Sequence, residues 1–158
     1  MNIADLKHLN GTYACLVPNN EGKAALEQLQ KDCNIPKAVS ASSMHMTVIY
    51  SRTPCPASLE LVGSFTPIYG KIVGFKYLPT QNGTRCIVAE IDCNDAIDLH
   101  NHIRETYGAG HDYPSYIAHI TLSYDCAKDV VPIIQPIPVV FDTLKISALD
   151  TNWQATSD

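Results

Sequence analysis

The chain has 158 residues, of which 46% are hydrophobic and 17% are charged, and its formal net charge at pH 7 is −5. This length and composition fit one globular domain spanning residues 1–158, with a continuous hydrophobic core. The acidic balance excludes a protein that holds long DNA or RNA in a basic groove, although a pocket for one small phosphate ligand needs only a few donors. No stretch has the roughly 18 to 20 apolar residues of a membrane span, and the first ten residues lack the apolar core of a secretory signal. We therefore expect a cytoplasmic protein that does not enter a membrane.

The predicted elements form a weak internal repeat of two strand-helix-strand-strand halves, at about residues 11–78 and 85–149. In the first half, stretches rich in residues that favour β-strands predict strands at 11–17, 44–50 and 69–78. The spacing of apolar residues predicts a helix at 23–33. The prolines within residues 51–67 predict that the last two strands are joined by a loop.

In the second half, the corresponding stretches predict strands at 85–91, 116–125 and 138–149. Asn94 is expected to cap a helix at 95–108. The positions of this helix that would face the core are Ala96, Ile97, Leu99 and Ile103. His100 and His102 lie two positions apart and point in different directions, so both are expected in solvent. The fold class predicted is α+β, with two pseudo-symmetric halves whose antiparallel sheets surround a central cleft.

Each half contains one copy of the same short motif, a histidine and a threonine separated by one apolar residue. The copies are His45 with Thr47 and His119 with Thr121. Side chains alternate along a strand, so each histidine shares a face with its threonine. An approximate two-fold axis between the halves would bring both pairs to a single ligand. One imidazole could then accept a proton from an attacking hydroxyl, the other could protonate the leaving oxygen, and the threonines could donate to phosphate oxygens.

Two structural alternatives bear on these motifs. A lone histidine in an apolar strand is usually a hydrogen-bonded core residue, but the other four histidines have no serine or threonine two positions later, so the duplication favours catalysis. A metal site would need more ligands than one nitrogen per strand without an adjacent carboxylate or thiolate, and we predict no metal and no other cofactor. The six cysteines contain no pair separated by two residues, and they are expected to be buried free thiols.

Both motifs resemble those of the 2H phosphoesterases, a family defined by two copies of histidine, hydrophobic, serine or threonine, hydrophobic, which read HMTV and HITL here. The blocks LKHLNGTYACLVP, SMHMTVIYSRTPCP and YIAHITLSYD are further similar to the phage anti-CBASS nucleases, which destroy the cyclic oligonucleotide messengers of a bacterial defence system. The resemblance covers residues 1–153. It implies metal-free hydrolysis of 3′,5′ linkages in cyclic di- and trinucleotides inside an infected bacterium, with His45, Thr47, His119 and Thr121 as the catalytic set.

The resemblance also implies aromatic partners for the bases of the substrate. By position, the candidates are Tyr13 in the first strand, Tyr116 shortly before the second motif, and Trp153. Each of these rings could instead pack in the core or cap the sheet. An acidic residue that reads a base is expected near the end of the last strand, where this sequence has Ser147, so the base preference can differ from that of the family.

Two other functions stay open at this point. An RNA-end enzyme that opens 2′,3′-cyclic phosphates or closes 2′,5′ junctions would use the same four residues, although it would usually be more basic. A non-catalytic sponge that only sequesters the cyclic nucleotide would not need a matched acid and base. The preferred messenger and the oligomeric state are not determined by these patterns.

Overall fold

A computed structural model describes residues 10–80, 83–111, 115–130 and 135–149 of the chain. Within them, six strands form one antiparallel sheet in the order β2-β1-β6-β3-β4-β5. The strands are β1 (Thr12–Pro18), β2 (Met46–Ser51), β3 (Ile68–Pro79), β4 (Arg85–Asp92), β5 (His119–Ser123) and β6 (Ile137–Ala148). No helix in this part of the chain is long and apolar enough to cross a membrane.

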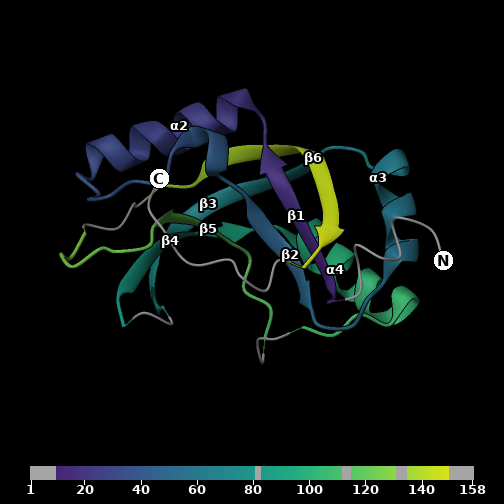
Figure 1. Cartoon of the computed structure of the whole chain (residues 1–158). Coiled ribbons are helices and arrows are strands. Elements are labelled where there is room, and N and C mark those ends of the chain that lie inside the picture. The colour runs from purple at the N-terminus through teal and green to yellow at the C-terminus, as the bar shows by residue number, and fades with distance from the viewer. Residues whose placement is uncertain (1–9, 81–82, 112–114, 131–134, 150–158) are drawn as a thin grey trace.

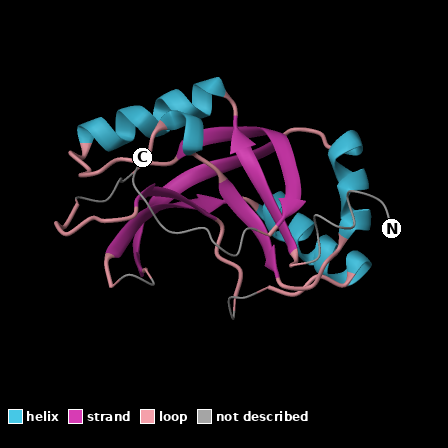
Figure 2. Ribbon diagram, in the orientation of Figure 1, coloured by secondary structure: helices cyan, strands magenta, loops and turns pink. Residues whose placement is uncertain are grey.

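The helices flank the sheet. Helix α2 lies at one end of the molecule, and α3 and α4 lie at the other end (Figures 1 and 2). The α-helices are α2 (Asn20–Asp32), α3 (Glu60–Ser64) and α4 (Asn94–Tyr107), and the short 3-10 helices are η1 (Ala41–Ser43) and η2 (Pro56–Leu59). Buried apolar residues of α2 and α4 join those of all six strands in one core.

The sheet is continuous because each half of the chain places its last strand beside the other half. Strand β3, from the first half, pairs with β4, and β6, from the second half, pairs with β1. The two exchanged strands pair with each other at the centre of the sheet. An approximate two-fold axis therefore passes between β3 and β6 and relates β1 to β4 and β2 to β5. The predicted α+β class with two strand-helix-strand-strand halves is confirmed, and the halves share one sheet.

Helix α2 begins at Asn20, three residues before the predicted start. The side chain of Asn19 explains the earlier start, because its Oδ1 accepts a hydrogen bond of 2.8 Å from the backbone N–H of Gly22. A side-chain acceptor at this position satisfies one of the free N–H groups of the first helical turn. The sequence prediction followed the apolar residues Ala25, Leu26 and Leu29, which lie further along the helix.

Helix α4 differs from expectation at its start and on its inner face. Asn94 is the first helical residue, and the capping position belongs to Cys93. Ile97 was expected inside but is 42% exposed, and His100 was expected in solvent but is only 3% exposed. Helical periodicity explains why His100 is buried in place of Ile97, because His100 lies between Ala96 and Ile103 on the buried face. His102 lies in solvent, as expected.

The predicted loop at residues 51–67 is wrong in part, because it contains η2 and α3. Proline is compatible with the first positions of a helix, and Pro56 occupies such a position in η2. The hydroxyl of Ser58 donates to the backbone carbonyl of Cys55 at 2.7 Å, which stabilises the turn. Of the six cysteines, all are buried except Cys33, which is half-buried.

Candidate active site

The two motifs lie on the outermost strands of the sheet. In and just before β2, Met44, Met46 and Val48 are buried, whereas His45 and Thr47 are half-buried. Strand β5 repeats this pattern, with Ile120 and Leu122 buried and His119 and Thr121 half-buried. The alternation confirms that each histidine shares a face with its threonine. We call the sheet face that carries these four side chains the motif face.

The edge strands β2 and β5 contact each other although they lie at opposite ends of the sheet order. The hydroxyl of Tyr116, which precedes β5, donates a hydrogen bond of 2.8 Å to the backbone carbonyl of Thr47 in β2. The charge of His45 also contributes to the pKa of His119. These contacts bring the two predicted motifs together in one site.

Both motif histidines are oriented in the same way by a backbone carbonyl two residues earlier. His45 Nδ1 lies 2.8 Å from the carbonyl oxygen of Ser43, and His119 Nδ1 lies 2.7 Å from that of Ile117. A carbonyl oxygen only accepts hydrogen bonds, so Nδ1 carries the proton in both rings. Nε2 is therefore the atom of each ring that can accept or release a proton.

The environment of His119 favours its neutral form. Burial lowers the pKa of His119 from its usual value, and the positive charges of His45 and Lys76 lower it further. The hydrogen bond from Nδ1 to Ile117 acts in the opposite direction but is smaller than the effect of burial. His119 is thus suited to accept a proton near neutral pH.

Tyr13 lies beside the first motif. Its hydroxyl forms a hydrogen bond of 2.8 Å with Thr47 Oγ1, and its ring meets the imidazole of His45 edge-on at 6.3 Å between centroids. If the tyrosine donates this bond, the threonine hydroxyl keeps its own proton for a ligand. Across the β1–β6 ladder, Tyr13 stands opposite Ser147, the residue that takes the place of the expected acidic group.

Tyr116 packs against His100 of α4. One face of its ring is stacked on His100 at 4.3 Å between centroids, with 13° between the planes. Burial raises the pKa of Tyr116 well above its usual value, and its hydroxyl is bonded to the backbone of Thr47. This placement supports the packing alternative for Tyr116. The third aromatic candidate, Trp153, lies outside the described residues.

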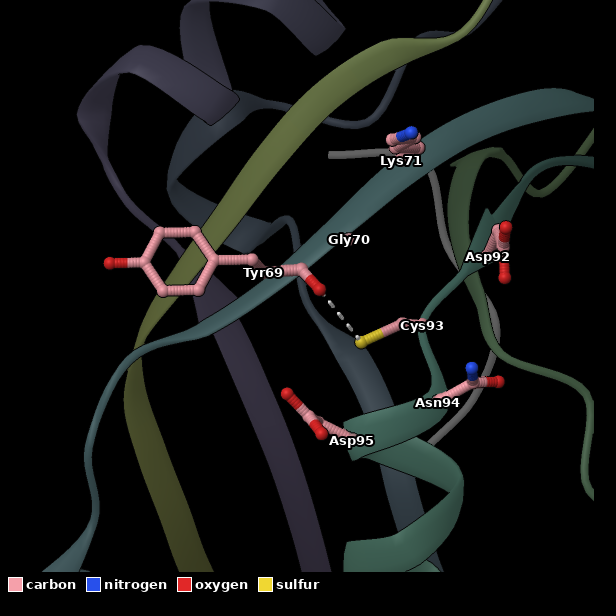
Figure 3. A pocket seen from close by; sticks show the side chains of 7 residues that line it. All are labelled: Tyr69, Gly70, Lys71, Asp92, Cys93, Asn94 and Asp95. Carbon is pink, nitrogen blue, oxygen red and sulfur yellow. Dashed lines mark hydrogen bonds between the residues drawn. The ribbon is translucent and has the colours of Figure 1, made fainter.

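The described residues contain no group of three or more His, Cys, Asp or Glu side chains that could hold a metal ion. A hollow of about 360 Å³ lies elsewhere, where α4 begins beside β3 (Figure 3). It is lined by Tyr69, Gly70, Lys71, Asp92, Cys93, Asn94 and Asp95. Its two carboxylates make it a poor place for a phosphate, and none of the four motif residues lines it.

The fold is shared with solved structures of low sequence identity. A structure of TT0787 from Thermus thermophilus matches with a TM-score of 0.65 and 18% identity, over 85% of this chain and 86% of that one. Apo LigT from E. coli matches with a TM-score of 0.57 and 16% identity, over 85% of this chain and 84% of LigT. The chain therefore has the fold of the 2H phosphoesterases, and it carries the doubled motif by which it resembles them.

Residues 10–156 match the family model described as Anti-CBASS protein Acb1, and the chain belongs to this family. The Anti-CBASS protein Acb1 of Vibrio phage KVP40 is 28% identical over 159 aligned residues, with complete coverage of both chains. Its counterpart in Salmonella phage S16 is 30% identical and covers 91% of each chain. That of Enterobacteria phage T4 is 31% identical over 82% of each.

Proposed function

We propose that this protein is a metal-independent phosphodiesterase that hydrolyses 3′,5′ linkages in cyclic di- and trinucleotide messengers and thereby counteracts the CBASS defence. The observation that carries the proposal is the pairing of two equivalent His-x-Thr motifs on edge strands that contact each other. Membership of the Anti-CBASS protein Acb1 family supports the role in CBASS. Structures of LigT bound to 3′-AMP and to NADP⁺ share the fold, with TM-scores of 0.52 and 0.55, and support a nucleotide ligand.

In the mechanism we propose, Nε2 of His119 takes a proton from the attacking water molecule as the water oxygen bonds to phosphorus. The bond between phosphorus and the leaving ribose oxygen then breaks, and that oxygen takes a proton from Nε2 of His45. The lowered pKa of His119 supports this division of roles, because a base must be neutral when the reaction begins. A positive charge on His45 disfavours protonation of His119, so the two imidazoles tend to carry one positive charge between them.

The hydroxyls of Thr47 and Thr121 would donate to the non-bridging oxygens of the reacting phosphate. Negative charge builds up on these oxygens in the transition state, so donors fixed in advance lower the barrier. The bond from Tyr13 to Thr47 supports this role, because it holds the threonine hydroxyl in one orientation.

A product assay tests the reaction. The purified protein is incubated with cyclic dinucleotides, cyclic trinucleotides and 2′,3′-cyclic nucleotides, and the products are resolved by mass. We expect linear products from the cyclic oligonucleotides. Turnover of 2′,3′-cyclic phosphates alone would make the protein an RNA-end enzyme, and tight binding without turnover would make it a sponge.

A second experiment tests the division of roles between the histidines. His45→Ala and His119→Ala should each lower the rate by about 10² to 10⁴-fold. A cyclic dinucleotide with sulfur in place of the leaving oxygen releases a thiolate, which needs no proton. This substrate should restore most of the rate of His45→Ala but not that of His119→Ala. Rescue of His119→Ala alone would reverse the two roles.

A further inference from the structure

Lys145 of β6 projects from the motif face in the same row as a motif threonine. It stands opposite Cys15 of β1, and Cys15 stands opposite Thr47 of β2. Residues directly opposite each other in an antiparallel ladder project from the same side of the sheet. The neighbours Leu144 and Ile146 are buried in the core, whereas Lys145 is exposed, which agrees with this direction.

Lys76 of β3 has the same place in the other half of the sheet. It stands opposite Val88 of β4, and Val88 stands opposite Thr121 of β5. The approximate two-fold axis that relates the two motifs therefore also relates Lys76 to Lys145. Lys76 is exposed as well.

Both lysine charges act on residues of the site. The charge of Lys76 is among the causes that lower the pKa of His119, after burial. Burial raises the pKa of the Cys15 thiol, and the charge of Lys145 opposes this effect. In the part of the chain that the structure describes, neither ammonium group is in an ion pair, whereas Lys37 pairs with Asp125.

A cyclic oligonucleotide presents more charge than the motif residues can balance. Each linkage carries one negative charge, the chain itself has a net charge of −5, and Glu90 stands opposite His119 in the β4–β5 ladder. Strands lie about 4.8 Å apart, so the backbone of each lysine lies about 10 Å from that of its threonine. A lysine side chain can cover much of that separation and reach a phosphate beside the reacting one.

We propose that Lys76 and Lys145 are substrate-binding residues, which in a cyclic trinucleotide contact the two phosphates on either side of the reacting phosphate. This inference rests on the proposed function and adds the charge recognition that the His-x-Thr motifs do not provide. The two lysines lie on opposite sides of the two-fold axis. In a cyclic oligonucleotide, equivalent phosphates likewise follow one another around the ring.

The test compares Lys76→Met, Lys145→Met and the double variant with Lys31→Met, which removes an exposed lysine from α2. The probe is a cyclic trinucleotide whose three linkages are phosphorothioates, which keep their charge and resist hydrolysis, and calorimetry measures its Kd. Each single variant should raise Kd by about 5- to 30-fold, and the effect should shrink at high salt. With the ordinary substrate the loss should appear mainly in KM, Lys→Arg should restore binding, and Lys31→Met should bind as the parent protein does.

The outcomes separate this inference from the proposed function. Unchanged Kd and KM in the double variant, with normal hydrolysis by the parent protein, would overturn the role of the lysines and leave the function intact. A fall in kcat at constant Kd would also overturn it, because the lysines would then act on the chemistry. Weakened binding of the probe by a protein that hydrolyses no cyclic oligonucleotide would support the lysines and refute the function. A parent protein that neither binds nor hydrolyses would refute both.

Discussion

Gln30 and His100 make the same contact from opposite halves of the chain. Gln30 Nε2 in α2 donates to the backbone carbonyl of Leu122 at 3.0 Å, and His100 Nδ1 in α4 donates to that of Val48 at 2.7 Å. Each acceptor directly follows a motif threonine. The two donors are buried, with exposed fractions of 4% and 3%. Each helix therefore fixes the motif strand of the other half.

The acceptors are special because each is the extra residue of a β-bulge. In the β1–β2 ladder the register shifts at Val48, and in the β4–β5 ladder it shifts at Leu122. A bulged residue leaves the regular ladder, so its buried carbonyl needs another donor. His100 provides this donor at Val48, and Gln30 provides one at Leu122, whose carbonyl also accepts a hydrogen bond of 2.9 Å from the backbone N–H of Val39. These bonds lie beside the two threonines and couple the packing of the helices to the geometry of the site.

Loss of either donor should reduce both stability and activity. His100→Leu removes the helical donor to the buried carbonyl of Val48. Gln30→Leu removes the donor to the carbonyls of Leu122 and Val39. Each variant should lower the free energy of unfolding by about 1 to 3 kcal/mol. The rate should also fall, because the neighbouring threonine loses its support. Urea unfolding and steady-state kinetics measure the two effects. His102→Leu, on the exposed face of the same helix, is the control and should change stability by about 0.5 kcal/mol or less. Equal losses in His102→Leu would refute the role of the bulge contact.

The stability of the protein should decrease as the pH falls below about 6.5. Burial lowers the pKa of His119 in the folded state, so below about pH 6.5 the unfolded chain binds a proton that folded His119 does not. The free energy of unfolding then falls with pH until the lowered pKa of His119 is reached. His119→Gln removes this contribution and should make the pH dependence in urea unfolding less steep, and His100, whose pKa is also lowered by burial, accounts for slope that remains. An unchanged slope in His119→Gln would show that His119 titrates alike in the two states.

Activity should persist in a chelator. The proposed reaction moves protons between two imidazoles and the substrate, and the described residues contain no cluster of ligands for a metal. The rate of cyclic dinucleotide hydrolysis should be the same with and without excess EDTA. Loss of turnover in EDTA, with recovery on addition of zinc or manganese, would refute the metal-free mechanism.

Tyr13 and Tyr116 should respond differently to loss of the hydroxyl group. Tyr116→Phe removes the partly buried bond to the backbone of Thr47 and should lower the free energy of unfolding by about 1 to 2 kcal/mol, measured by urea unfolding. Tyr13→Phe removes the partner of the Thr47 side chain and should instead lower kcat, by about 3- to 10-fold, with a smaller effect on stability. If Tyr13→Phe destabilises the fold and leaves kcat unchanged, its bond to Thr47 serves packing and not catalysis.

Much of the local structure follows from the sequence. The apolar residues on either side of Thr47 and Thr121 determined which face of each strand would be buried, since alternation is a property of the strand itself. The duplicated order of strands and helices likewise followed from short-range patterns. The start of α2 and the helices within residues 51–67 did not, because side-chain caps and short helical turns leave weak signals in composition.

The sequence by itself determined the two His-x-Thr pairs and the face that each pair shares. Only the tertiary structure decided that β3 and β6 exchange between the halves and that the edge strands β2 and β5 contact each other. It also buried His100 against a bulge and placed Lys76 and Lys145 in the rows of the motif threonines. The physical reason is the separation along the sequence over which each effect acts. Alternation and helical period act over a few residues, whereas strand order, register and the partners of buried polar groups depend on which distant segments pack together.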